Sequence, residues 1–299
     1  MDWARDLPDW PSHALSRRVS CPPHAWHVQE TGRGPTLLLL HGAGSSTHTW
    51  RGIVPLLANR VHLVALDLPG QGFTQAGTRH RLGLNGMTED IASLCNREGW
   101  RPTAIVGHSA GACLALTLSR ILVTPEGTPP AVIGINAALG HFDGIAGWLF
   151  PVLAKLMALN PLTALAFSAG PGPLRRAERL IAGTGSHLDA EGLRLYARLI
   201  SDRAHVDGTL RMMASWTIDP LLDSLPEIAA RCLLITASGD RAVPPQISAQ
   251  AARRLRHAQL CKIDGFGHLV HEEAPERIAP LLCDWICAAN PDRSLRSGV

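Results

Sequence analysis

Residues 103–120 read TAIVGHSAGACLALTLSR, in which an apolar run, a glycine-flanked serine and a helix-like run follow one another. TAIV is a short apolar run rich in β-branched residues and predicts a buried strand, whereas ACLALTLSR predicts a helix. Ser109 lies between them in GHSAG, on a strand-to-helix turn that holds its hydroxyl strained and exposed above the sheet. Gly107 and Gly111 are needed because side chains there would collide with the strand and the helix. The pattern predicts a nucleophilic serine, with an ordinary structural turn as the alternative.

Short apolar runs alternate with helix-like segments on both sides of this stretch. The expected strands are 25–30, 36–40, 61–66, 103–106, 131–135, 232–236 and 259–263. The expected helices are 87–100, 110–123, 245–255 and 275–289. The run LLLL is apolar at every position, as in a strand buried on both faces. The alternation predicts an α/β fold with a mostly parallel central sheet flanked by helices on both sides.

The alternation breaks once, between residues 137 and 230. That interval has helical character, in GIAGWLF, VLAKLMALN, RRAERLIAGTG and EGLRLYARLI. We expect two units: a core made of 1–136 and 231–299, and a helical cap at 137–230. An ordinary set of packing helices is the alternative, but the segment carries more apolar surface than four short helices need for one another.

A nucleophilic serine needs a base that is held by an acid, and both follow later strands. Asp240 comes after the expected strand at 232–236, and His268 comes after the one at 259–263, in the sequence GFGH. Ser109, Asp240 and His268 occur in a chain order known for serine-aspartate-histidine triads. Ligands bind at the carboxyl ends of parallel strands, so the three side chains can converge there. We predict that these three residues are catalytic.

Other histidines and acids fit structural roles better. His108 occupies the variable position of the GHSAG turn and is expected to pack beside the site. His271 lies on the turn into the last expected helix. His41 is expected to shape the loop after the LLLL strand. Asp67, in DLPGQG, is expected to pin a turn, and Asp264 lies one strand too late to be the acid.

The loop HGAGSS at 41–46 supplies what a triad lacks. A tetrahedral intermediate needs two preorganised N–H donors for its oxyanion. We predict that the backbone amides of Ala110, directly after the serine, and Ala43, in the glycine-rich loop, form this oxyanion hole. The alternative for the loop is an ordinary tight turn.

HGAG, DLPGQGFT, GHSAG, GDRAVP and GFGHLVHEEAPE, in this order, resemble the α/β-hydrolase superfamily from about residue 20 to 289. The resemblance implies the same triad and oxyanion hole and no cofactor or metal. Many relatives have histidine where Gln71 stands, and some place the acid near Asn136. An asparagine cannot serve as the acid, which favours Asp240. Serine rather than aspartate at the elbow argues against haloalkane dehalogenases and epoxide hydrolases.

Less generic stretches resemble the magnesium-chelatase accessory proteins of bacteriochlorophyll biosynthesis. They are DWPSHALSRRV, WHVQETGRGPTLLLLHGAGSSTHTWR, INAALGHFDGIAGWLFP, LMALNP and RLIAGTGSHLDAEGLRLY. This resemblance implies a phototrophic bacterial host and tetrapyrrole synthesis. It implies a small apolar substrate, a tetrapyrrole among the candidates, and magnesium chelatase subunits as candidate partners, without defining the reaction.

Composition excludes several other classes. The net charge is +3 from 28 basic and 25 acidic residues, without a basic stripe, so no nucleic-acid partner is expected. Seven cysteines without a CxxC pair, including Cys283 and Cys287 one helical turn apart, are expected to be small buried residues in a reducing compartment. The first residues have no secretory h-region, and 145–167 is interrupted by prolines, lysine and asparagine, so a cytoplasmic location is expected.

Three functions stay open from the sequence. The first is a serine hydrolase acting on an ester of a bulky apolar molecule, with Arg175, Arg176 or Arg179 as candidates to meet a propionate. The second is a non-catalytic chelatase accessory or porphyrin-binding protein. The third is a carbon–carbon bond hydrolase with the same triad. Residues 148–150 (Trp-Leu-Phe) offer a weak peripheral membrane contact, or equally a wall of the cleft.

Overall fold

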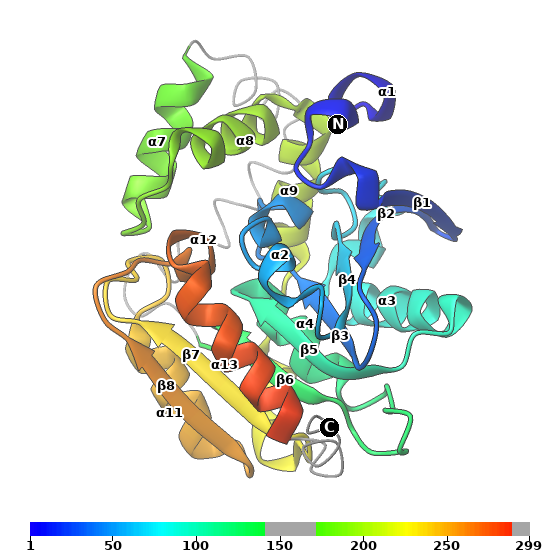
Figure 1. Ribbon diagram of the computed structural model, residues 1–299, viewed down its shortest axis with the longest axis vertical. Helices are drawn as coiled ribbons and strands as arrows, with labels where there is room; N and C mark the ends of the chain where they lie inside the picture. The colour runs from blue at the N-terminus through cyan, green and yellow to red at the C-terminus, as the bar shows by residue number, and fades with distance from the viewer. Residues whose placement is uncertain (141–171, 289–299) are drawn as a thin grey trace.

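A computed structural model describes residues 1–140 and 172–288 (Figure 1). Within these residues, eight strands form one sheet in the order β1-β2-β4-β3-β5-β6-β7-β8. They are β1 Ser16–Cys21, β2 His24–Thr31, β3 Thr36–Leu40, β4 His62–Leu66, β5 Pro102–His108, β6 Ala131–Ile135, β7 Cys232–Ala237 and β8 Ala258–Ile263. β2 pairs antiparallel with β1 and β4, and the other pairs are parallel. The predicted mostly parallel sheet is therefore confirmed.

Helices cover both faces of the sheet (Figure 1). The α-helices of the described residues are α1 Trp3–Asp6, α2 Val54–Leu57, α3 Leu84–Glu98, α4 Ala110–Leu118, α7 Pro173–Gly183, α8 Ala190–Ser201, α9 Arg203–Ser215, α10 Asp219–Asp223, α11 Pro245–Arg254, α12 Val270–Glu273 and α13 Pro275–Ala288. Short 3-10 turns occur at Leu7–Asp9, His13–Leu15, Thr47–Trp50, Arg79–Leu82 and Leu225–Glu227. α3, α4 and α11 pack on one face of the sheet, and α2 and α13 pack on the other.

The leucines of β3 show why the sheet has two covered faces. Successive side chains of a strand point to opposite faces. Leu38 and Leu40 accordingly belong to the apolar cluster under α3 and α4, and Leu37 and Leu39 belong to the cluster under α2 and α13. All four are fully buried, as the continuous apolar run predicts.

Two local expectations were incomplete. β1 was not expected because Arg17 and Arg18 interrupt its apolar character, and it is an antiparallel edge strand whose side chains alternate between exposed and buried near its end. α4 ends at Leu118 rather than near residue 123, and Ile121 and Val123 beyond it are more than half exposed. Apolar residues at the expected end of this helix therefore did not mark a buried face.

The described residues between β6 and β7 contain the helices α7 to α10. α7 and α8 lie beyond the end of the sheet in Figure 1. Residues 141–171, which include GIAGWLF and VLAKLMALN, lie outside the described residues. The division into a core and a cap stays a prediction. A third apolar cluster joins Ile181 of α7 and Tyr196 of α8 to Trp10, Phe73 and Leu269 from other parts of the chain.

The described cysteines are free thiols. Five of these are buried, and Cys261 is half-buried. Burial raises the pKa of the Cys113 and Cys232 thiols to about 12. These thiols are therefore protonated at neutral pH, and the side chain of Cys287 lies outside the described part.

Candidate active site

Ser109 forms the turn between β5 and α4, where the sequence predicts a nucleophile elbow. Its backbone has φ 53° and ψ −117°, a combination that costs energy for any residue with a side chain. A Cβ on Gly107 would lie 2.2 Å from the carbonyl oxygen of Gly111, and a Cβ on Gly111 would lie 2.3 Å from that of Leu40. Both glycines are therefore required for β5, α4 and β3 to approach this closely.

The structure brings Asp240 and His268 together at the carboxyl ends of β7 and β8. His268 Nδ1 lies 2.7 Å from Asp240 Oδ2, and the Asp240 side chain is completely buried. The other oxygen, Oδ1, accepts hydrogen bonds of 2.8 Å from the amides of Ala242 and Val243. The carboxylate is thus fixed in orientation, and it selects the Nδ1–H tautomer that leaves Nε2 of the imidazole free to accept a proton.

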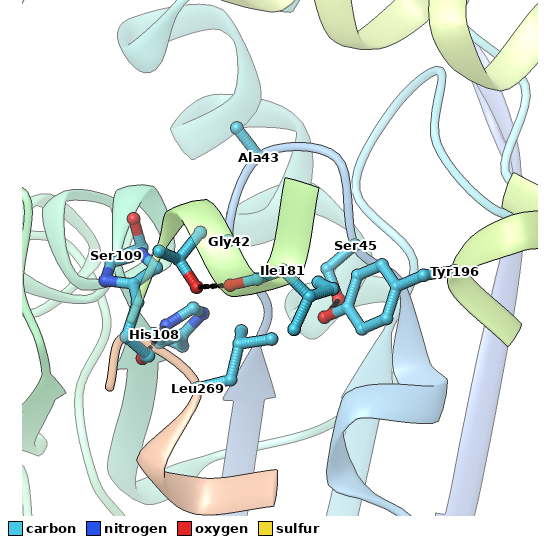
Figure 2. A pocket seen from close by; sticks show the side chains of 10 residues that line it. Gly42, Ala43, Ser45, His108, Ser109, Ile181, Tyr196 and Leu269 are labelled. Atoms are coloured by element: carbon cyan, nitrogen blue, oxygen red, sulfur yellow. Dashed lines mark hydrogen bonds between the residues drawn. The ribbon is translucent and has the colours of Figure 1, made fainter. Parts of the chain in front are cut away.

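Ser109 and His268 line one cavity of about 110 Å³. Its other lining residues are Gly42, Ala43, Ser45, His108, Ile181, Thr184, Tyr196 and Leu269 (Figure 2). Among the residues that the structure describes, no hydrogen bond joins the Ser109 side chain to His268. Catalytic hydrogen bonds are often long without substrate and shorten in the substrate complex. The three residues that the sequence singles out as a triad therefore meet at one place, with Asp240 behind His268 and Ser109 in the same cavity.

Of the two residues predicted to supply the oxyanion-hole amides, one lines this cavity and the other directly follows Ser109, which lines it. Ala43 lines it, and Ala110 is the first residue of α4. In residues 1–140 and 172–288 neither amide has a hydrogen-bond acceptor. Gln71 supports the loop because its Oε1 accepts a 2.6 Å hydrogen bond from the amide of Gly44. Within the described part of the chain both alanine amides therefore keep a hydrogen to donate, and Gln71, where many relatives have histidine, has a structural role.

Asn136 holds the histidine loop against the tip of β7. Its Nδ2 donates to the carbonyl oxygens of Gly267 and His268 at 3.1 and 2.8 Å, and its Oδ1 accepts from the amide of Ala237 at 2.8 Å. Its φ of 44° is tolerated better by asparagine than by most residues. Asn136 therefore fixes the height of His268 over the sheet, which the sequence did not reveal.

Asp67 and three histidines from the sequence analysis, His41, His108 and His271, have structural contacts. His41 lies between the carbonyl oxygen of Gly42 and the amide of Leu68. His108 contacts the carbonyl oxygen of His268 at 3.0 Å, and burial holds its pKa well below the usual value. His271 is buried, and its Nε2 lies 2.7 Å from Thr49 Oγ1. Asp67 accepts from the amides of Thr47 and Phe73, which pins two loops as expected.

The three arginines considered for a propionate do not reach the cavity. Arg175 and Arg179 are exposed on α7, Arg176 is half-buried, and none of them lines the cavity. α7 turns Ala177 and Ile181 inward instead. The arginines therefore form a largely solvated helix face, and Ile181 is the α7 residue that reaches the site.

A buried polar cluster next to the cavity was missed from sequence. Glu272 on α12 pairs through Oε2 with Arg51, and its Oε1 accepts hydrogen bonds from Thr49 (2.6 Å) and Tyr196 (2.7 Å). Tyr196 also meets Ser45 Oγ at 3.1 Å. Burial raises the pKa of Glu272, while Arg51 and the hydroxyl donors act in the opposite sense. The one available signal was that Tyr196 is the single tyrosine of the chain.

The described residues contain neither a metal-binding cluster nor a membrane-spanning helix. Residues 1–140 and 172–288 hold no group of three or more His, Cys, Asp or Glu side chains placed to bind a metal ion. No helix in that part is long and apolar enough to cross a membrane. Residues 148–150, considered for membrane contact, lie outside it.

Comparisons with known proteins agree with this fold. The model of the alpha/beta hydrolase family matches residues 37–281. The chain is 45% identical to the magnesium-chelatase 30 kDa subunit of Rhodobacter capsulatus over 94% of this chain and 98% of the relative. It is 25% identical to the 2-(acetamidomethylene)succinate hydrolase of Mesorhizobium japonicum over 96% and 100% of the two chains. A solved structure of a putative lipase from Acinetobacter baumannii superposes with a TM-score of 0.77 at 19% identity, covering 98% of both chains. The chain therefore belongs to the alpha/beta hydrolase family.

Proposed function

We propose that the protein is a serine hydrolase that cleaves an ester or similar acyl bond. The observation that carries the proposal is the hydrogen bond between His268 and a buried, doubly anchored Asp240, next to a cavity that also holds the strained Ser109. Such a constellation activates a serine that is otherwise a weak nucleophile.

The reaction would proceed in two halves. Nε2 of His268 takes the proton of Ser109 as Oγ attacks the carbonyl carbon, and the amides of Ala43 and Ala110 stabilise the oxyanion. The protonated His268, stabilised by Asp240, then gives its proton to the leaving oxygen, which leaves an acyl group on Ser109. A water molecule attacks the acyl carbon with His268 again as base, which releases the acid and restores the serine. The residues supply every proton transfer, so no cofactor is needed.

The lining of the cavity favours an apolar acyl group. Ile181 and Leu269 flank the space next to Ser109 (Figure 2). A cavity of about 110 Å³ takes the reacting end of a substrate rather than a tetrapyrrole macrocycle. If the substrate is a tetrapyrrole ester, as the 45% identity to a magnesium-chelatase subunit suggests, its macrocycle lies outside this cavity. We place the activity in the cytoplasm, in bacteriochlorophyll biosynthesis at the magnesium chelatase stage.

Ester hydrolysis tests the proposal directly. Wild type and the Ser109→Ala variant are compared on p-nitrophenyl esters of short and long acids. We expect a loss of roughly 10³-fold or more in kcat for Ser109→Ala, because removal of the nucleophile leaves only binding and the oxyanion hole. Equal rates for both proteins would overturn the serine mechanism.

A second candidate function is a non-catalytic accessory role with the magnesium chelatase subunits. The observation in its favour is the identity to the Rhodobacter capsulatus subunit over nearly the whole of both chains. Reconstituted chelatase is assayed for Mg²⁺ insertion with added wild type or Ser109→Ala. Equal stimulation by the two proteins supports the accessory role, and stimulation by wild type alone supports the hydrolase.

A further inference from the structure

We propose that Ser45 and Tyr196 form a second subsite of the cavity that recognises a neutral hydrogen-bond donor, a hydroxyl or N–H group, on the acyl part of the substrate. This inference rests on the proposed function, because it describes the same cavity. Beyond the proposed function, the inference specifies the chemistry of a substrate group that lies away from the scissile bond.

The subsite is separate from the nucleophile. Ser45 and Tyr196 line the cavity and are both buried. Figure 2 shows them at the opposite end from Ser109, with Ile181 and Leu269 between. An acyl chain with its carbonyl carbon at Ser109 would therefore pass two apolar side chains before it meets a pair of hydroxyl groups.

The buried cluster behind this pair sets the direction of its protons. The Arg51 cation pairs with Oε2 of Glu272 and favours its ionised form, and an ionised carboxylate can only accept, so Oε1 accepts from Thr49 and Tyr196. Tyr196 has a single proton and donates it to Oε1 at 2.7 Å. Its 3.1 Å contact with Ser45 must then use the proton of the Ser45 hydroxyl.

Both hydroxyl protons thus point away from the cavity. A serine hydroxyl has one proton and two lone pairs, so Ser45 Oγ has only acceptor capacity left for a ligand. A hydroxyl or N–H placed there gains a hydrogen bond. A carboxylate or ether oxygen placed there faces lone pairs, and burial makes this mismatch costly.

Matched pairs of p-nitrophenyl esters test the subsite. 6-Hydroxyhexanoate and 6-methoxyhexanoate differ by a hydroxyl donor, and 3-(pyrrol-2-yl)propanoate and 3-(furan-2-yl)propanoate differ by a ring N–H donor. The measured quantity is the ratio of kcat/KM within each pair, because any general loss of activity cancels. We expect wild type to favour the donor by roughly threefold to tenfold in at least one pair, and the pair that shows it identifies the donor.

Two variants change this ratio in different ways. Ser45→Ala removes the acceptor, so the ratio should fall to about one. Tyr196→Phe frees the Ser45 proton, so the Ser45 hydroxyl can then donate as well as accept, and the ratio should fall toward one through a gain for the methoxy or furan ester. Ile181→Val is the matched control: it lines the same cavity without a polar group and should leave the ratio at the wild-type value.

Binding to Ser109→Ala separates failure of the subsite from failure of the hydrolase proposal. Calorimetry with the methyl esters of the same acids reads the donor preference without turnover. If Ser109→Ala binds the donor ester more tightly, and this preference is lost when Ser45→Ala is added to the same protein, the subsite is supported even if no ester is hydrolysed. Equal affinity and equal turnover within both pairs, or a ratio unchanged in Ser45→Ala while its melting temperature falls, would overturn the subsite and leave Ser45 and Tyr196 a structural link.

Discussion

Asp240→Asn should lower activity severely while leaving the fold intact, because the neighbouring backbone dictates how the new amide must point. Oδ1 of Asp240 accepts two amide hydrogen bonds, from Ala242 and Val243, and Oδ2 faces Nδ1 of His268. An asparagine must keep its oxygen on the two amides. Its NH2 group then faces His268 and donates to Nδ1, which places the ring proton on Nε2, the atom that must accept the proton of Ser109.

The size of the effect follows from the alternative orientation. To restore the active tautomer the amide must flip, which leaves the two backbone donors unsatisfied at about 2 kcal/mol each. A cost of about 4 kcal/mol populates the active form in roughly one molecule in 10³. We therefore expect kcat/KM for a p-nitrophenyl ester to fall roughly 10³-fold, with a near-UV circular dichroism spectrum like that of wild type.

Asp264→Asn is the matched control for this prediction. Asp264 is an exposed carboxylate directly after β8, in the same loop that carries His268. Its neutralisation should change kcat/KM by less than about twofold, because surface charges are screened. Retention of more than a tenth of wild-type activity by Asp240→Asn, or an equal loss in both variants, would refute the assigned role of Asp240.

Three further predictions concern stability. Asn136→Ala removes three buried hydrogen bonds and should lower the free energy of unfolding by about 2–4 kcal/mol. It should also lower kcat, because Asn136 holds the loop that carries His268. An unchanged urea midpoint would contradict this prediction. Gly111→Ala places a Cβ 2.3 Å from a carbonyl oxygen and should lower the melting temperature far more than Gly183→Ala, where nothing lies within 4 Å; equal melting temperatures would count against the elbow geometry. Burial lowers the pKa of His205 to about 4 and of His271 to about 3. Between pH 6.5 and 4 the unfolded chain therefore binds more protons than the folded one. The free energy of unfolding should decrease as the pH is lowered through this range, by up to about 1.4 kcal/mol per pH unit for each histidine. A flat dependence of the urea midpoint on pH over that range would contradict it.

Local sequence predicted the features that depend on short segments. The LLLL run indicated a strand buried on both faces, and GHSAG, SGD and GFGH indicated which strand tips carry Ser109, Asp240 and His268. Each of these signals is a turn or a strand of a few residues. Backbone geometry at such places restricts the residue type, so the sequence retains the information.

Features that depend on contacts between distant segments could not be predicted. Glu272 is oriented by Arg51, 221 positions earlier, and by Tyr196 from a different helix. Nothing near Glu272 in sequence distinguishes it from an exposed glutamate at the start of a helix. Arg175 and Arg179 illustrate the opposite error. Their residue type made them candidates to bind a propionate, but α7 buries Ala177 and Ile181 and leaves these arginines on its exposed face.

Covalent labelling shows whether Ser109 is an activated nucleophile. Wild type is treated with a fluorophosphonate, and the modified peptide is identified by mass spectrometry. A single adduct on Ser109 that forms faster than on Asp240→Asn and is absent from Ser109→Ala is the predicted result. Absence of an adduct on folded wild type, or an adduct that persists in Ser109→Ala, would contradict the claim.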